Sequence, residues 1–223
     1  DKPFVAASEQ ARQLIELAHA RKLVLSAYQN RRWDGDFLTL KKLIADGELG
    51  RVVSLESRFE RYHPGLRPKP WQEKNLPGNG LVHDLGAHLA DQALVLFGTP
   101  EAVTGDMRYD RDQTAVNDGF AIHLHYPRLR VSLHASLLAC TPGPRFVAHG
   151  TNGSYVKYGL DPQEPALKGG AVLGGPHWGE EPEAAWGKLT TMKDGAAVER
   201  SVATLAGDYR RYYENVRDGS LGR

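Results

Sequence analysis

The stretch GNGLVHDLGAHLADQALVLFG, residues 78–98, indicates the fold most directly. Turn-forming residues end at Gly80, and from Asp84 onward apolar residues recur at helical spacing: Leu85, Leu89, Ala93 and Leu96. Such spacing places apolar side chains in one stripe along a helix, and that stripe must be buried against another element. We therefore expect an amphipathic helix here. A second helix is predicted over about 35–46, with Gly47 as its stop and an inward face formed by Phe37, Leu40 and Ile44.

The segments around these helices alternate apolar and polar residues, which is typical of strands with one buried face. Val53, Leu55, Ser57 and Phe59 alternate with polar residues, so that strand has one buried and one solvated face. The later sets that share one face are Val103, Met107 and Tyr109; Phe120, Ile122, Leu124 and Tyr126; and Leu129, Val131, Leu133, Ala135 and Leu137. Thr151-Asn152-Gly153 supplies turn chemistry for a hairpin over residues 146–159. Short turns between successive strands favour antiparallel pairing. The predicted fold class is α+β, with a mainly antiparallel open sheet covered on one face by helices.

The first 33 residues have a different pattern. Ser8 can cap a helix over about 9–20, and LVLSAY, residues 23–28, has the continuous apolar composition of a buried parallel strand. A helix followed by a buried strand is typical of the last unit of a doubly wound α/β domain. We therefore interpret residues 1–33 as a remnant of such a domain and residues 34–223 as a second domain.

The last third of the chain gives weaker signals. Residues 160–195 are rich in Gly and Pro and are predicted to form a long loop. A helix is expected near 205–217, where the residues at helical spacing are Tyr209, Tyr212, Tyr213 and Val216. Packing is a more natural role for these tyrosines than ligand binding.

Composition excludes several classes of partner. The formal net charge of +1 gives no reason to expect nucleic acid or an anionic membrane. Cys140 is the single cysteine, so no intrachain disulfide can form, and we expect it to be buried at a strand end. No apolar run approaches the length of a membrane span. These features favour a cytoplasmic protein.

Three residues have side chains suited to moving a proton on or off a hydroxyl. Asp84 and His88 stand four residues apart, which places both on one face of a helix. A carboxylate can orient an imidazole, and the ammonium of Lys2 can stabilise a developing alkoxide. Spacing alone favours structural roles instead: Asp84 as a helix cap, His88 as a core-edge histidine and Lys2 as a surface charge.

Four ordered motifs resemble the glucose–fructose oxidoreductase/inositol dehydrogenase (Gfo/Idh/MocA) family. They are Lys2-Pro3, YQNRRWDGDF at 28–37, KKLIADGELG at 41–50 and DLGAH at 84–88. The family carries E-K-P, N-R-R-[FW] and D-x-G-x-H motifs in this order, although Asp1 stands here where the family usually has Glu. The similarity continues in FVAHGTNGSYVKYGLDPQE, residues 146–164.

The resemblance assigns expected roles and an expected cofactor, NAD or NADP. The catalytic residues it implies are Lys2, Asp84 and His88. The cofactor-binding residues are Lys2, Pro3, Gln29, Asn30 and Arg31. The substrate-binding residues are Trp33, Trp71, Asp84 and His88. It implies a sugar, polyol or related hydroxy compound as substrate and a homo-oligomer built through the open sheet face. It also implies that residues 1–33 are the end of a Rossmann domain and that residues 34–223 are a substrate-binding and oligomerisation domain.

One family feature has no counterpart in this sequence. The Gly-rich turn G-x-G-x-x-G, which presents a helix N-terminus to the pyrophosphate of a dinucleotide, occurs nowhere in the chain. We therefore expect the main phosphate-binding site to lie outside this chain, the chain to be the C-terminal portion of a longer oxidoreductase, and the portion alone to be inactive.

Two other functions stay open. The missing phosphate cradle also fits a non-catalytic sugar-binding or dimerisation module. A metal site is a further reading, because His123 and His125 share a strand face and His134 can neighbour them. No carboxylate or thiolate joins these histidines at ligand spacing, so no metal is expected.

Overall fold

The sheet has the strand order β2-β3-β4-β1-β5-β6-β7-β8 in the computed structural model, which describes residues 2–221. Asp1, which differs from the family motif, lies outside the described residues. The strands are β1 (Val52–Glu60), β2 (Ala102–Arg108), β3 (Gly119–Tyr126), β4 (Leu129–Ser136), β5 (Phe146–Gly150), β6 (Gly153–Lys157), β7 (Gly187–Lys193) and β8 (Ala196–Val202). Strands β1 and β4 are parallel, and the other neighbouring pairs are antiparallel.

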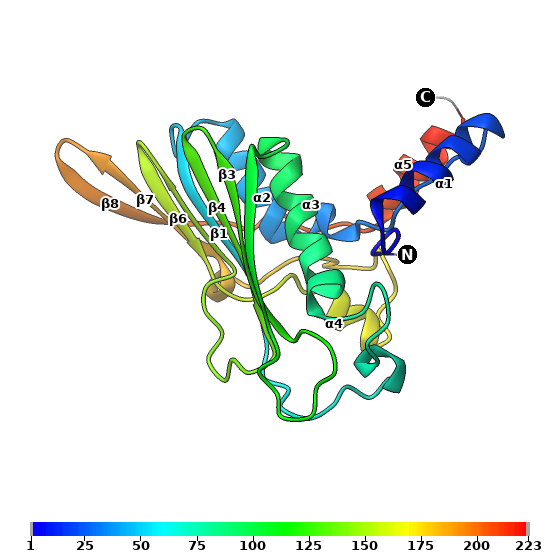
Figure 1. Cartoon of the computed structure of the whole chain (residues 1–223). Coiled ribbons are helices and arrows are strands. Elements are labelled where there is room, and N and C mark those ends of the chain that lie inside the picture. Colours follow the sequence, from blue (N-terminus) through cyan, green and yellow to red (C-terminus); the bar gives the residue numbers. More distant parts are fainter. Residues whose placement is uncertain (1, 222–223) are drawn as a thin grey trace.

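Helices lie on one side of this sheet and leave its other side bare (Figure 1). They are α1 (Ser8–Ala20), α2 (Gly35–Ala45), α3 (Ala87–Phe97), α4 (Gln163–Lys168) and α5 (Arg210–Ser220). A π-helical turn, Val82–Gly86, leads into α3, and a short 3-10 turn, Asn30–Trp33, leads into α2. The predicted α+β class, with a mainly antiparallel open sheet covered by helices on one face, is confirmed.

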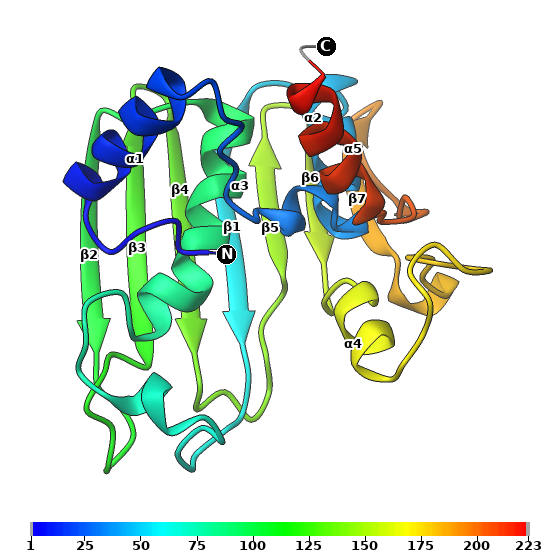
Figure 2. The same cartoon turned by 90° about the vertical axis from the view of Figure 1, so that its right-hand side faces the viewer.

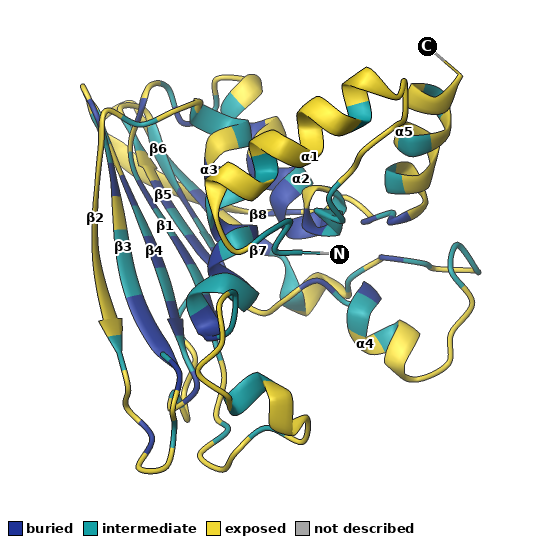
Figure 3. Cartoon of the chain, turned by 45° about the vertical axis from the view of Figure 1, so that its right-hand side comes forward, coloured by how far each residue is buried: buried dark blue, intermediate teal, exposed yellow. Residues whose placement is uncertain are grey.

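The core lies between the sheet and the helices α2 and α3. Phe37 and Leu40 of α2 and Leu85 and Leu89 beside the sheet are buried, as their spacing predicts. Figure 3 shows buried positions concentrated where the sheet meets these helices. Burying one such side chain stabilises the fold by roughly 1.5–3 kcal/mol, so this layer holds the start of α3 firmly against the sheet.

The register of β1 corrects one expected face. Leu55, Ser57 and Phe59 are buried as predicted, but Val52 is buried and Val53 is exposed. The pairing of β1 with β5 shifts between Val52 and Ser54. Such a shift inserts one unpaired residue and turns the next side chain to the opposite face.

The buried strand expected over residues 23–28 is wrong for the described chain. These residues form no strand, and Leu23 is 64% exposed. A parallel strand needs neighbours to satisfy its backbone and cover its side chains, and no described segment pairs with this one. Helix α1 forms over the expected residues, yet none of them is buried. Figure 1 shows α1 farther from the sheet than α3, and Figure 2 shows it in front of β2 and β3.

The long loop expected over 160–195 is also wrong in part, because it contains α4 and β7. Strands β7 and β8 form a hairpin whose turn is Asp194-Gly195, with φ of 51° and 80°. Two positive φ angles characterise the tight hairpin turn that Asp-Gly favours. The other Gly and Pro residues of the segment favour a loop, so the sequence does not single out this Asp-Gly turn.

Three further observations concern α5, Cys140 and the length of the helices. Helix α5 begins at Arg210 and not near 205, so Tyr209 precedes it. Cys140 is exposed in an irregular segment, which contradicts the expected burial. No helix within residues 2–221 is both long enough and apolar enough to cross a bilayer.

Candidate functional site

A cavity of about 450 Å³ opens between the N-terminal segment, the π-helical turn before α3, and α4. Segments far apart in the sequence meet here, because the sheet holds the start of α3 against them. The lining residues are Lys2, Tyr28, Asn30, Arg31, Arg61, Lys69, Gln72, Asp84, Leu85, His88, Glu164, Leu167, Lys168 and Tyr209. The cavity lining therefore contains acidic and basic side chains and few aliphatic ones.

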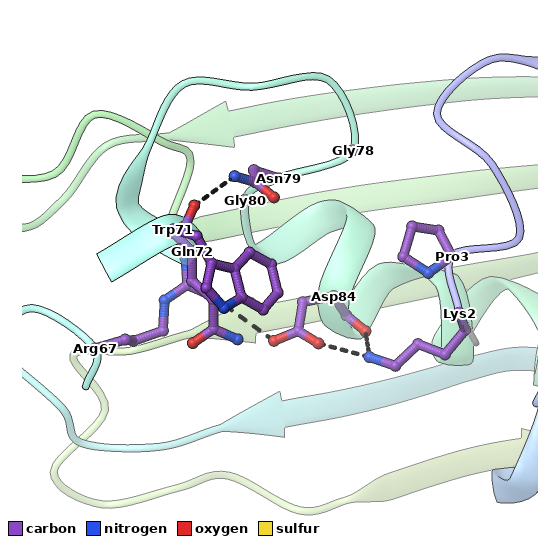
Figure 4. A pocket seen from close by; sticks show the side chains of 9 residues that line it. All are labelled: Lys2, Pro3, Arg67, Trp71, Gln72, Gly78, Asn79, Gly80 and Asp84. Atoms are coloured by element: carbon purple, nitrogen blue, oxygen red, sulfur yellow. Dashed lines mark hydrogen bonds and ion pairs between the residues drawn. The ribbon is translucent and has the colours of Figure 1, made fainter. Parts of the chain in front are cut away.

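Lys2 and Asp84 form an ion pair at this cavity. The Lys2 Nζ donates to Asp84 Oδ1 at 2.6 Å and to the Asp84 carbonyl at 2.5 Å (Figure 4). The second carboxylate oxygen lies 3.8 Å from the Arg67 guanidinium. The wide turn over Val82–Gly86 places Asp84 toward Lys2, and no hydrogen bond joins Asp84 to His88 in the described structure. Asp84 therefore does not orient the His88 ring as expected. That expectation assumed that residues four apart share one face of an α-helix, and this spacing does not hold in a π-helical turn.

His88 is buried in the first turn of α3 and still lines the cavity. Its Nδ1 is buried and has no hydrogen-bond partner among residues 2–221. Burial lowers the pKa of His88 to about 2, and the positive charges of Lys2, Arg31 and Arg145 act in the same direction. The imidazole is therefore neutral near pH 7.

Arg31 links the cavity wall to the core. Its guanidinium is 3.2 Å from Asp34 and also pairs with Glu164, which in turn accepts from Lys168 at 2.6 Å. Burial acts to raise the pKa of Glu164, but Lys168 and Arg31 outweigh it and lower that pKa to about 2. Glu164 is thus a fixed negative charge that holds two cations in place.

A buried polar network lies behind His88. Arg145 forms an ion pair with Asp36 at 3.2 Å and donates to Ser57 and Gln92 at 2.6 and 2.7 Å. Gln92 donates at 2.8 Å to the backbone carbonyl of Arg31. This chain of contacts fixes the position of Arg31 relative to α3 and so shapes the cavity.

The structure brings together five of the residues predicted for the site. Lys2, Asn30, Arg31, Asp84 and His88 line the same cavity. Pro3 and Trp71 line a smaller adjoining hollow with Lys2 and Asp84 (Figure 4).

Gln29 and Trp33 are not brought to this cavity. They line a separate hollow beside Tyr212, and the Trp33 ring packs edge-on against Tyr212 with centroids 5.9 Å apart. The 3-10 turn over Asn30–Trp33 directs these side chains away from Arg31.

Several lining residues were missed by the sequence reasoning. Arg61 follows β1, Lys69 precedes a short 3-10 turn, and Glu164 and Lys168 lie on α4. Glu164 and Lys168 stand four residues apart with opposite charges. This spacing is a helical signal within the segment that is expected to be a loop. Tyr209, expected only to pack, also lines the cavity and donates to Asp34 at 2.8 Å.

The histidines of the open sheet face form a polar surface. The rings of His123 and His134 lie 6.0 Å apart, and His125 contacts the hydroxyl of Thr104 at 3.0 Å. Within residues 2–221 no group of three or more His, Cys, Asp or Glu residues is arranged to hold a metal ion.

Residues 37–156 match the family model for the GFO/IDH/MocA C-terminal domain. The chain belongs to the GFO/IDH/MocA family. It is 45% identical, over 100% of its length, to the uncharacterized oxidoreductase YdgJ of Escherichia coli, and it covers 63% of that protein. It is 36% identical over 99% of its length to scyllo-inositol 2-dehydrogenase (NADP(+)) IolW of Bacillus subtilis, covering 62% of it.

Solved structures of the family have the same fold. A protein from Yersinia pestis is 44% identical and superimposes with a TM-score of 0.92, over 100% of this chain and 62% of that one. An oxidoreductase from Bacillus cereus is 36% identical with a TM-score of 0.88, over 97% of this chain and 72% of that one. The chain thus spans about three fifths of the length of these two curated relatives.

Proposed function

We propose that this chain supplies the substrate half of an NAD(P)-dependent oxidoreductase that oxidises or reduces a sugar, polyol or related hydroxy compound. One observation carries the proposal: Lys2, from the start of the chain, lines one cavity with Asp84 and His88, which lie more than eighty residues later. The name of the scyllo-inositol relative supports a hydroxy compound as substrate and NADP as one candidate cofactor.

The residues at the cavity fit the reacting end of a nicotinamide cofactor. Lys2 supplies a cation held by Asp84, and His88 supplies a neutral imidazole whose buried Nδ1 lacks a partner in the described structure. Asn30 and Arg31 would lie beside the cofactor. When bound, the nicotinamide accepts or donates the hydride.

Each of these side chains has a defined part in the oxidation direction. His88 accepts the proton of the substrate hydroxyl. Lys2 stabilises the alkoxide that forms as the proton leaves. Asp84 positions Lys2 through their 2.6 Å contact. In the reduction direction, the protonated His88 returns its proton to the carbonyl oxygen.

Residues 1–33 are proposed to belong to the cofactor-binding domain. Helix α1 buries none of its residues in the described structure, and Ile15, Leu23 and Val24 are 55%, 64% and 49% exposed. Exposed apolar side chains on consecutive elements indicate a surface that another layer covers. The alternative, a sugar-binding or dimerisation module without redox chemistry, gains no specific support from these contacts.

The test is turnover by the full-length protein with NAD or NADP and a panel of polyols and sugars. His88→Asn and Lys2→Ala should each lower kcat by roughly 10²- to 10⁴-fold, the usual contribution of a general acid–base group. His177→Asn and Lys41→Ala, at exposed positions outside the cavity, are the matched controls. Unchanged turnover in both cavity variants would refute the proposal.

We also propose that a second copy of the chain covers the open sheet face. That face is bare of helices (Figure 1) and carries Val147 and Val156, which are directly paired on β5 and β6.

A further inference from the structure

The cavity at Lys2 and His88 carries an excess of positive charge. Five of its lining side chains are cationic, namely Lys2, Arg31, Arg61, Lys69 and Lys168, and two are carboxylates, Asp84 and Glu164. The neutral imidazole of His88 adds no charge, so the lining has an excess of three positive charges. A neutral polyol gives no reason for such a lining.

The carboxylates are already committed to particular cations. Asp84 holds Lys2, while Glu164 holds Arg31 and Lys168. The side chains of Arg61 and Lys69 have no carboxylate within ion-pair distance anywhere in residues 2–221. The uncompensated charge of the cavity is therefore concentrated on these two.

Arg61 also borders a second hollow of about 220 Å³, which shares Arg31, Glu164 and Lys168 with the main cavity. A guanidinium between two concave spaces is available to a ligand that reaches past the reacting centre. The planar fork of arginine matches the oxygens of a carboxylate or phosphate, and a nearby ammonium adds a second charge-assisted hydrogen bond.

We infer that the cavity selects a hydroxy compound bearing a carboxylate or a phosphate ester, and that Arg61 and Lys69 bind this anionic group. The placement of the reacting hydroxyl beside Lys2 and His88 rests on the proposed function, whereas the anion site does not. Arg61 and Lys69 are specificity-determining residues in this arrangement, and neither has a part in the proton transfer.

The electrostatics of His88 agree with an anionic ligand. Besides burial, the cations Lys2, Arg31 and Arg145 lower the pKa of His88, and Glu164 opposes them. A further negative charge in the cavity raises this pKa toward neutrality, where an imidazole is most effective as a base. Substrate charge would thus assist the chemistry as well as binding.

The first experiment measures binding without turnover. The full-length protein is titrated with inorganic phosphate at low ionic strength by calorimetry, while the imidazole signals of His88 and His19 are followed by NMR. Phosphate should shift the His88 signal and leave His19 unchanged. Arg61→Gln with Lys69→Gln should weaken binding by at least about 10-fold, since each lost contact is a charge-assisted hydrogen bond. The matched double control, Arg128→Gln with Lys193→Gln, alters exposed positions outside the cavity and should bind as the wild type does.

The second experiment separates the possible sources of the anion. D-glucose, D-glucuronate and D-glucose 6-phosphate are compared for binding to the wild type and to the Arg61/Lys69 double variant, and NADPH affinity is measured in parallel. We expect at least one of the two anionic compounds to bind about 10-fold or more tightly than glucose, and this preference to disappear in the variant while NADPH affinity is kept.

Three results would overturn the inference. The first is that neither phosphate nor either anionic sugar binds the wild type. The second is that the double variant loses affinity for glucose and for its anionic derivatives to the same extent. The third is that the variant loses affinity for NADPH alone, which would assign the two cations to the cofactor phosphates. Anion binding that depends on Arg61 and Lys69 in a protein without redox turnover would sustain the inference and refute only the proposed function.

Discussion

Arg145 shows how a single residue connects the core to the cavity. Its guanidinium lies between the rings of Phe59 and Phe146, at 4.2 and 4.0 Å from their centroids, and pairs with the fully buried Asp36. Burial lowers the pKa of Arg145 and Asp36 acts to raise it. Removing either partner leaves an uncompensated charge in an apolar layer, which is costly.

Arg145→Met should therefore destabilise the fold by about 3–5 kcal/mol. The double variant Arg145→Met with Asp36→Asn should recover a large part of this loss, because no charge is then left unpaired. Urea unfolding of the four members of this mutant cycle measures both effects. Arg128→Met is the exposed control, with an expected change within about 0.5 kcal/mol. A double variant less stable than Arg145→Met alone would contradict the assignment.

At the scale of elements, the N-terminus of α2 gathers three carboxylates. Asp34 and Asp36 flank Gly35, and Asp161, from the segment before α4, accepts the Gly35 N–H at 2.7 Å. Negative charge is favoured at a helix N-terminus by the helix dipole. Burial, followed by the charge of Asp36, nevertheless raises the pKa of Asp161 to about 6.

This raised pKa has a consequence for stability. Between about pH 4 and pH 6 the folded chain keeps a proton on Asp161 that the unfolded chain has lost, so stability rises as the pH falls through 6. Relative to Asp161→Asn, the wild type should gain about 2 kcal/mol between pH 7.5 and pH 4.5, at 1.36 kcal/mol per pKa unit.

Unfolding free energies of both proteins at the two pH values check this expectation. Comparison with Asp161→Asn cancels the titration of other groups, including the buried His88, whose lowered pKa acts in the opposite direction. Asp112→Asn, at an exposed position, should follow the wild type at both pH values. Parallel pH profiles for the wild type and Asp161→Asn would show that Asp161 is not the titrating group.

At the scale of the whole molecule, the sheet has one covered and one bare face. Alternation places Tyr155 toward the helices and Val156 toward the bare side. A two-fold dimer buries the same patch on both copies, so one substitution there acts twice.

Val156→Lys should therefore convert the proposed dimer to monomer at micromolar concentration, because each interface would receive two buried ammonium groups. Sedimentation equilibrium of the full-length protein measures the change. Val198→Lys alters the opposite, helix-bearing side of β8 and serves as the control, with no expected effect on assembly. If the wild-type protein is monomeric at high concentration, the proposed interface is wrong.

The sequence by itself determined the elements whose burial has a regular period. The stripe through Leu85 and Leu89 predicts α3, and the alternation along residues 120–137 predicts two strands. This works because the spacing of apolar residues reflects which side of a single helix or strand is buried. Its motif order also indicated the family and named Lys2 and His88. Only the tertiary structure decided that Asp84 pairs with Lys2 and not with His88, that residues 23–28 have no strand partner in the described chain, and that Arg61 and Lys69 enter the same cavity. These contacts join segments tens of residues apart, and their geometry is set by packing across the fold, which local spacing does not encode.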